Sequence, residues 1–344
     1  MPGAANALVA HPQRQSFSVH MTTTQPQPEI LIRTLAESEI GEARRIIRLA
    51  FATFLGLPTD DPRMGGDSDA AGPRWKADPS SVLAAEHGGK LIGTNFATTW
   101  GSFGFFGPLS IEPEYWNRGV AQQLLGPTMG IFRSWGTRHT GLYTFAQSPK
   151  HMALYQKFGF WPRDLVVVMA RQVDGKPAAA VPEMLRFSET AGEGRPQLLG
   201  ECREITDALF EGLDVGNEIR AVAEQNLGDT ILVRDGGKLA AFAVCHSGAG
   251  SEAGSGVCYV KFAAVRPGRR ASEIFERLLD AVESYARAAK APKITAGVNL
   301  ARREAFQAVL ARGFRTEMQG VAMETGDATS GYNRAGAYIL DDWR

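Results

Sequence analysis

The sequence predicts a mixed α/β protein made of two tandem copies of one α/β unit. Helical and strand-like patterns alternate along the chain, and short motifs recur in order. The step Gly88-Gly89-Lys90-Leu91 recurs at 236–239, and Gly159-Phe160 recurs at 313–314, an offset of 148 and then of 154 residues. The offset changes near the Gly/Ser-rich stretch "HSGAGSEAGSG", which is suited to an insertion. We therefore expect two domains, each a mostly antiparallel sheet flanked by helices.

Composition narrows the classes of function. The chain has 344 residues, which allows about two domains. Its 37 basic and 37 acidic residues balance, so charge gives no argument for nucleic acid or an anionic membrane as a partner. No apolar run approaches the roughly 20 residues of a membrane span. The three cysteines are too few for a disulfide framework, so we expect a reducing, cytoplasmic location.

The repeat sets the expected domain boundaries. The start of the chain lacks the charged and apolar blocks of a signal peptide, so residues 1–28 are expected to be a disordered leader. We expect an N-terminal domain at 29–171, a linker at 172–183 and a C-terminal domain at 184–325. The tail 326–344 ends in "AYILDDWR", which is too apolar for a free end. It is expected to dock as a strand or arm on the first domain or on a partner subunit, and a homodimer is a further expectation.

In the first copy the elements follow from local patterns. "ILIRTLAES" predicts a strand, and apolar residues from Ile40 to Phe51 fall at helical spacing. The stretch 58–79 is rich in Gly, Asp and Pro and predicts a long loop or a broken helix. A hairpin is expected to turn at Gly88-Gly89, and "FFGPLSI" predicts the next strand.

The segment "YWNRGVAQQLL" is the first candidate for a ligand site. A helix start carries unpaired N–H groups and a partial positive charge, which together bind phosphate where no side chain blocks the approach. Gly119 removes that obstruction, Ala121 keeps the next turn small, and Arg118 adds a positive charge. An ordinary helix start remains an open alternative for this segment taken alone.

A second segment, "QSPKHMALYQKFGFWPRD", predicts a short helix. Ser148 is a typical N-cap, Pro149 suits the first helical turn, and Gly159 is a typical C-terminal stop. Tyr155 lies close to the end of this helix.

Together the two segments resemble the GNAT acetyltransferase family. In that family a loop of the form (Gln/Arg)-x-x-Gly-x-(Gly/Ala), and a later helix with a Tyr before Gly-Phe, hold acetyl-CoA. Here the loop is Trp116 to Ala121, with Trp116 in place of Gln or Arg, and Ser148 stands where many members have Asn. The resemblance covers about 30–171 and, more weakly, 184–325. It implies an N-acetyltransferase that moves an acetyl group from acetyl-CoA to the amine of a small or amino-acid-like molecule. A protein that binds acyl-CoA without turnover, such as a sensor, remains the alternative.

The resemblance also implies roles for individual residues. Tyr155 matches the family's general acid, and a core tyrosine is the other interpretation. The strand "GPLSI" is expected to lie against the pantetheine arm of the cofactor, with the backbone of Leu109 and Ile111 bonded to it. The cofactor-binding residues implied in this way are Leu109, Ser110, Ile111, Asn117, Arg118, Gly119, Val120, Ala121, Ser148 and Tyr155.

The base and the acceptor pocket are less well defined by the sequence. Glu112 is the better carboxylate candidate for the base, although surface placement or a base acting through water stays open. The acceptor pocket is expected between loop 58–79, whose acids could attract a cationic amine, and "TTWGSFGFF". Trp100 and Phe105 are candidate acceptor-binding residues, unless they are core. His139 and His151 are isolated, and no His/Cys spacing indicates zinc, so we expect no metal site.

The second copy lacks the same motifs. The offset of 154 takes Gly119 to Glu273, Ala121 to Phe275 and Tyr155 to Val309. A carboxylate at a helix start occupies the position that a pyrophosphate would use. We therefore expect a degenerate C-terminal copy, which is structural or walls the acceptor cleft.

Overall fold

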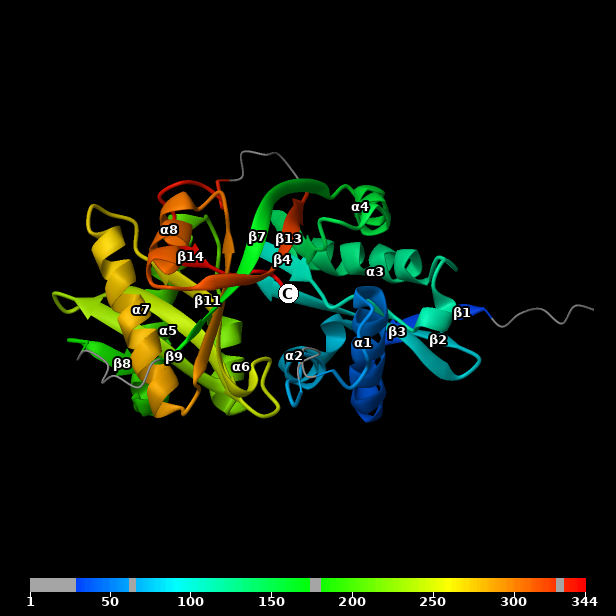
Figure 1. Ribbon diagram of the computed structural model, residues 1–344, viewed down its shortest axis with the longest axis horizontal. Coiled ribbons are helices and arrows are strands. Elements are labelled where there is room, and N and C mark those ends of the chain that lie inside the picture. The colour runs from blue at the N-terminus through cyan, green and yellow to red at the C-terminus, as the bar shows by residue number, and fades with distance from the viewer. Residues whose placement is uncertain (1–28, 62–65, 174–180, 326–330) are drawn as a thin grey trace, which may run out of the picture.

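The computed structural model describes residues 29–61, 66–173, 181–325 and 331–344 (Figure 1). The leader expected at 1–28 and the centre of the expected linker lie outside these ranges. The N-terminal and C-terminal halves of the chain lie side by side, and Arg344 lies between them (Figure 1).

The N-terminal half contains a sheet with helices on its faces. The hairpin between β2 and β3 turns at Gly88 and Gly89, whose φ values of 59° and 79° are left-handed. Part of the stretch 58–79, expected to be a long loop or a broken helix, forms the short helix α2. The elements are β1 (Ile30–Thr34), α1 (Ile40–Leu55), α2 (Ala71–Ala77), β2 (Val82–His87), β3 (Lys90–Trp100), β4 (Phe103–Phe106), β5 (Ser110–Ile111), α3 (Val120–Trp135), β6 (His139–Thr144), α4 (Pro149–Gln156) and β7 (Trp161–Gln172).

The C-terminal half repeats this order with two differences: one long strand, β11, takes the place of β4 and β5, and a last strand, β14, follows β13. The hairpin between β9 and β10 again turns at two left-handed glycines, Gly236 and Gly237. The elements are β8 (Met184–Arg186), α5 (Arg195–Leu209), α6 (Gly216–Glu224), β9 (Gly228–Asp235), β10 (Lys238–Gly248), β11 (Gly254–Val265), α7 (Ala271–Ala288), β12 (Lys293–Asn299), α8 (Arg303–Ala311), β13 (Arg315–Glu324) and the additional β14 (Ile339–Leu340).

The strand pairing confirms the expected mixed, mostly antiparallel fold. Two parallel pairs occur, β4 with β6 and β11 with β12. Their registers match across the halves, because Phe103 faces His139 and Val257 faces Lys293, each residue 154 positions from its counterpart. The repeat seen in the sequence is therefore also a repeat of strand register.

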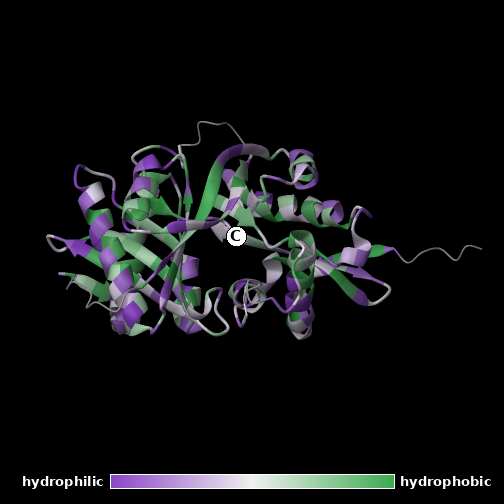
Figure 2. Cartoon of the chain, in the orientation of Figure 1, coloured by the Kyte–Doolittle hydropathy of each residue, from purple (hydrophilic) through white to green (hydrophobic). Residues whose placement is uncertain are grey.

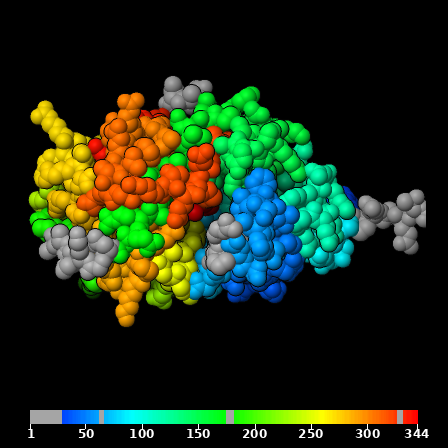
Figure 3. Space-filling model, viewed as in Figure 1, coloured from blue at the N-terminus to red at the C-terminus, as the bar shows by residue number. Residues whose placement is uncertain are grey.

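The two halves exchange their last strands. Strand β13 lies between β6 and β7 and pairs with both, while β7 pairs on its other edge with β12. The described strands thus form one continuous 14-stranded sheet. Twelve of them follow the path β1-β2-β3-β4-β6-β13-β7-β12-β11-β10-β9-β8, while β5 pairs with β3 and β14 pairs with β11 off this path. Hydrophobic residues concentrate on its strands, and hydrophilic ones on the outer sides of the helices (Figure 2). The halves consequently share one packed body and meet near its middle (Figure 3).

Residues 331–344 return to the sheet after β13. Strand β14 pairs antiparallel with β11, where Leu340 faces Ala263 and Ile339 faces Ala264. The side chains of Tyr332 and Trp343 are buried in the core between the halves. Among the described helices, none combines the length and the hydropathy that a bilayer crossing requires.

Candidate active site

A cavity of about 760 Å³ opens in the N-terminal half. Its walls come from α1, from the segment between β4 and α3, from the end of β6 and from α4, and the C-terminal half contributes one end. The residues that line the cavity include Phe51, Phe54, Arg74, Gly107, Leu109, Ile111, Asn117, Gly119, Val120, Ala121, Gln122, Tyr143, Lys150, His151, Tyr155, Lys157, Glu252, Trp343 and Arg344.

The start of α3 faces this cavity with bare backbone. Gly119 is the N-cap and has a left-handed φ of 76°, and Asn117 two residues earlier has a φ of 64°. A Cβ built on Gly119 would meet no atom within 4 Å, so packing sets no limit at this position and the left-handed backbone is what favours glycine. The first helical bond runs from Gln123 N–H to the carbonyl of Gly119. The N–H groups of the preceding residues lack partners inside the helix, and such groups at a helix start can bind an anion.

Aromatic side chains fix the loop before α3. Trp116 Nε1 donates to the carbonyl oxygen of Ile111 at 2.7 Å, which ties the loop to β5. The guanidinium of Arg118 lies 5.1 Å from the ring centre of Tyr115, and Arg118 does not line the cavity. Lys150 lies 5.6 Å from the ring centre of Trp116 and does line it. Lys150 therefore supplies positive charge at this end of the cavity, and Lys157 of the same region also lines it.

The cavity continues into a gap in the sheet. Strands β4 and β6 pair only as far as Phe105 and Gly141, and β5 then pairs with β3 instead. Leu109 and Ile111 line the cavity on one side of the gap, and Tyr143 lines it on the other. Ser110 does not line it and is buried. The gap exposes strand backbone to whatever occupies the cavity.

Tyr155 and His151 face the cavity from α4, one helical turn apart. Burial raises the pKa of Tyr155 to about 12 despite a hydrogen bond with Thr144, so its hydroxyl is protonated at neutral pH. The His151 ring is stacked on the Tyr155 ring with 6.4 Å between centroids and lies 4.9 Å from Phe54. Burial, and then the charge of Lys150, lower the pKa of His151, so this imidazole is neutral near pH 7. Its Nδ1 is buried without a hydrogen-bond partner among the described residues.

Sequence reasoning treated His151 as an isolated histidine. Its spacing of four residues from Tyr155 on a predicted helix was the available signal, since such residues share a face. Ser148, in contrast, is the N-cap of α4, where its Oγ accepts from the His151 backbone N–H at 3.4 Å. Ser148 does not line the cavity, so its contacts are those of a cap.

The structure does not support Glu112 as a base. Its carboxylate is buried, lies 2.7 Å from Arg45 and 2.8 Å from Lys90, and does not line the cavity. Burial would raise the pKa of Glu112, but the bonds from Lys90 and Arg45 outweigh that effect and lower it. Glu112 is an ion-paired structural group because the chain turns away from the cavity after Ile111.

The structure also gives no support for the predicted acceptor-binding role of Trp100 and Phe105, neither of which lines the cavity. Both side chains are fully buried in the core between the halves, where Trp100 packs against Phe105 and Phe262 at 4.7 and 5.2 Å between ring centres. Acids of the 58–79 stretch likewise have structural partners. Asp67 accepts from Ser255, and Asp69 binds Arg44 and caps α2. The side chain of α2 that lines the cavity belongs to a cation, Arg74, and not to an acid.

The C-terminal half closes one end of the cavity through an ion-pair network. Arg74 binds Glu252 through two bonds of 2.7 and 2.8 Å, and Lys261 binds the same carboxylate at 2.8 Å. Arg74 also donates to the carbonyl oxygens of Gly107 and Arg344. Burial opposes ionisation of Glu252, but the charges of Arg74 and Lys261 hold its pKa well below the usual range. Glu252 thus joins the two halves beside the gap in the sheet.

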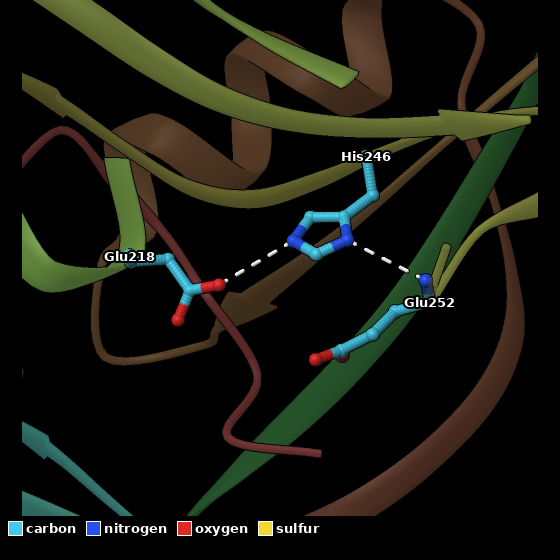
Figure 4. A group of neighbouring side chains, drawn as sticks. All are labelled: Glu218, His246 and Glu252. Carbon is cyan, nitrogen blue, oxygen red and sulfur yellow. Dashed lines mark hydrogen bonds and ion pairs between the residues drawn. The ribbon is translucent and has the colours of Figure 1, made fainter. Parts of the chain in front are cut away.

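Glu252 also belongs to a cluster with His246 and Glu218 (Figure 4). One potential metal-binding atom from each of the three residues lies within 4.8 Å of the others. His246 Nδ1 accepts from the Glu252 backbone N–H at 3.4 Å, and His246 Nε2 lies 3.4 Å from Glu218. Because Arg74 and Lys261 already neutralise Glu252, a further cation here would meet two positive charges. The cluster is best described as an ion-pair network.

The equivalent positions of the C-terminal half are filled. Glu273, in the first turn of α7, pairs with Arg270 at 2.6 Å. Phe275 and Val309 are buried in the core of this half. Side chains thus occupy the places that open to the cavity in the first half.

Comparisons with known proteins agree with this geometry. Residues 49–160 match the model of the acetyltransferase (GNAT) family. No curated protein matches the chain in sequence. The fold is similar to that of a proposed acetyltransferase from Pyrococcus horikoshii, with a TM-score of 0.66 and 13% identity over 91% of this chain and 95% of that one. It is also similar to a GCN5-related N-acetyltransferase from Sphaerobacter thermophilus, with a TM-score of 0.56 and 14% identity over 88% of this chain and 98% of that one.

A third similar structure has two such domains. It is a tandem GNAT protein from the clavulanic acid biosynthesis pathway, with a TM-score of 0.55 and 13% identity over 87% of this chain and all of that one. At these identities the structures establish the fold, and the family model establishes the domain. Acetyl-CoA is the acetyl donor of this family. Residues 49–160 therefore match the GNAT acetyltransferase model, and the chain as a whole has a fold similar to that of a tandem GNAT protein.

Proposed function

We propose that the chain is an N-acetyltransferase whose N-terminal half binds acetyl-CoA and acetylates the amine of a small molecule. One observation carries this proposal. A single cavity joins the anion site at Gly119 to the hydroxyl-bearing side chain of Tyr155, and it passes through the gap in the sheet between them. An elongated thioester that carries phosphate fits that path. Its phosphate end needs the N–H groups near Gly119, and its thioester end needs a proton donor such as Tyr155.

The residues present fit the cofactor. The pyrophosphate would lie at the backbone of Asn117 to Ala121, with Lys150 and Lys157 supplying charge from the cavity wall. The pantetheine arm would lie along Leu109 and Ile111 in the gap. Seven of the ten residues implied by the family resemblance line the cavity: Leu109, Ile111, Asn117, Gly119, Val120, Ala121 and Tyr155. Arg118, Ser110 and Ser148 do not, so we assign them to holding the loop, the strand and the helix.

Acetyl-CoA supplies an acetyl group activated as a thioester. Tyr155 is suited to give a proton to the departing sulfur, because it lines the cavity and its hydroxyl is protonated at neutral pH. His151 is suited to take the proton that the acceptor nitrogen must lose, directly or through water, because its imidazole is neutral and Nδ1 is unpartnered among the described residues. One turn of α4 thus carries both a donor and an acceptor of protons.

The acceptor site lies at the end that both halves build. Phe51 and Phe54 of α1 offer an apolar wall, and Arg74, Glu252 and Arg344 offer charge. The hydroxyl of Tyr143 is buried in the cavity without a partner among the described residues. This combination suits a small amine with an apolar body and at least one further polar group. The C-terminal half acts as a wall of this site.

Turnover with a panel of small amines tests the proposal. Acetyl-CoA is mixed with each amine, and the free thiol of CoA is followed for wild type and Tyr155→Phe. We expect amine-dependent thiol release that Tyr155→Phe strongly reduces while acetyl-CoA binding is retained. Binding without release for any amine would contradict the enzyme and favour an acyl-CoA-binding protein. Release that Tyr155→Phe leaves unchanged would contradict the role of Tyr155.

A further inference from the structure

The repeat shows which residues of the C-terminal half correspond to the open gap. The offset of 154 takes Leu109, Ser110 and Ile111 to 263–265, at the end of β11. In the N-terminal half this segment borders the cavity. In the C-terminal half it pairs with the tail, with Ala263 facing Leu340 and Ala264 facing Ile339. Val265 N–H extends this pairing by donating to the carbonyl of Tyr338 at 3.1 Å.

The tail also contacts the strand on the other side of the gap. The pairing of β11 with β12 ends at Val260 and Ala296. One residue further along β12, a Cβ built on Gly297 would lie 2.2 Å from the Cβ of Asp342, so the tail touches this strand where only glycine fits. Segment 338–342 therefore lies between the two diverging strands.

A buried ion pair holds the tail in this position. Arg302 is fully buried and binds Asp341 at 3.0 and 3.3 Å, and it also donates to the carbonyl of Ile339 at 3.2 Å. The Tyr332 hydroxyl donates to the same carboxylate. Because each charge loses its hydration, breaking one partner of this set is costly.

We propose that segment 338–342 is a built-in occupant of the cofactor-arm groove of the C-terminal half, where it takes the strand contacts that a pantetheine arm takes in the N-terminal half. The comparison with pantetheine rests on the proposed function. The occupancy itself rests on strand register. Together with Glu273 and Phe275, this segment closes the groove of the second copy.

The same segment delivers the end of the tail to the first half. A Cβ on Gly141 would lie 2.8 Å from the ring of Trp343, and Arg344 gives its carbonyl oxygen to Arg74. Residues 343 and 344 thus line the cavity because the preceding segment is anchored in the other half. The tail connects the closed groove to the open one.

Hydrogen exchange on the full chain with Asp341→Asn tests the occupancy. The substitution leaves Arg302 buried without a counter-charge, so the tail should leave the groove and the Val265 amide should exchange at least tenfold faster. Amides of β9 should keep their protection. Asp78→Asn is the matched control, since either side chain can cap the turn before β2. Unchanged exchange at Val265 would overturn the proposal.

A second measurement does not depend on how the Asp341→Asn chain folds. A chain ending at Gly336 is titrated with a synthetic peptide of residues 337–344, and binding and melting temperature are followed. We expect one peptide to bind and to restore the melting temperature, and a peptide carrying the Asp341→Asn substitution to bind at least tenfold more weakly. Acetyl-CoA should not replace the peptide at this groove. A shortened chain that melts like the full one, or ignores the peptide, would overturn the proposal. Neither measurement uses acetyl transfer, so failure of the proposed enzyme activity would be seen separately.

Discussion

The two halves of the molecule share an order of elements and a strand register, but one half keeps a gap open and the other fills it. In the N-terminal half the strands diverge around a cavity of about 760 Å³. In the C-terminal half the diverging strands β11 and β12 enclose β14 and its neighbours. The comparison teaches that the same two diverging strands can border an open cavity in one half and hold the chain's own tail in the other.

The helix starts show the same contrast at the level of single residues. Gly119 has a left-handed backbone, and a Cβ added to it would meet no atom within 4 Å. Glu273, in contrast, forms an ion pair with Arg270 at the first turn of α7. A carboxylate there satisfies the positive end of the helix from within the chain. A site for an external anion is thereby lost, and the α7 start becomes an internal ion pair.

The largest expected effect separates the two halves by chemistry. Tyr155→Phe should lower kcat by about 10²- to 10⁴-fold, the usual range for a positioned proton donor, with little change in acetyl-CoA affinity. Val309→Ala changes the equivalent residue of the C-terminal half. It should lower stability by leaving a cavity in the core, without changing turnover per folded molecule. Steady-state kinetics and denaturant unfolding measure the two effects. Equal losses of kcat in Tyr155→Phe and Val309→Ala would contradict the claim that only the N-terminal half carries out the chemistry.

A second substitution tests how the halves are joined. Glu252→Gln removes the counter-charge of Arg74 and Lys261, whose side chains are 8% and 2% exposed. The free energy of unfolding should fall by about 3–5 kcal/mol, as measured by urea denaturation. Glu211→Gln breaks an ion pair with Arg138 whose side chains are 78% and 60% exposed, and it should cost less than about 1 kcal/mol. Similar costs for the two variants would show that the network does not hold the halves together.

The pH dependence of turnover sharpens the role of His151. Its folded pKa is below the ordinary value of about 6.5, so the imidazole is neutral at pH 7 and gains a proton only as the pH falls through that lowered pKa. Activity should therefore fall on the acid side, below about pH 6.5. His151→Gln should remove this acid limb and lower kcat/KM at least tenfold at neutral pH. Gln156→Ala, an exposed change on the same helix away from the cavity, is the control. An acid limb that survives in His151→Gln would assign the base elsewhere.

The smallest expected effect concerns a residue that the family resemblance placed at the cofactor. Ser148→Ala should cost about 1 kcal/mol of stability through loss of the α4 cap. Acetyl-CoA affinity should change less than twofold, because the side chain does not line the cavity. Thermal unfolding and calorimetric titration give the two numbers. A tenfold loss of affinity at unchanged stability would return Ser148 to the cofactor site.

Local patterns were sufficient for much of the fold. Hairpin glycines, the Ser148 cap and the recurrence at 154 residues are set by neighbouring residues or by the repeat, and the fold class followed from them. The loop before α3 could be identified because Gly119 has a left-handed backbone, a conformation that glycine adopts readily, so the requirement is visible in the sequence.

The rest depends on contacts between distant segments. Glu112 was chosen for its place beside the cofactor strand, but its direction is decided by Arg45 and Lys90, which lie far away in the sequence. Trp100 and Phe105 are as apolar as pocket residues, and only the opposite half decides that they are core. The exchange of β7 and β13, and the arrival of Glu252 at the cavity, have no local pattern at all.

Calorimetric titration with acetyl-CoA tests the central claim most directly, because the claim concerns how many grooves accept a cofactor. The contrast between the halves predicts one site per chain. Gly119→Glu, which gives the first half the residue of the second, should abolish that site, while Gly119→Asn, which tolerates a left-handed backbone, should largely retain it. Two sites per chain, or one site that survives Gly119→Glu, would contradict an open first groove and a closed second one.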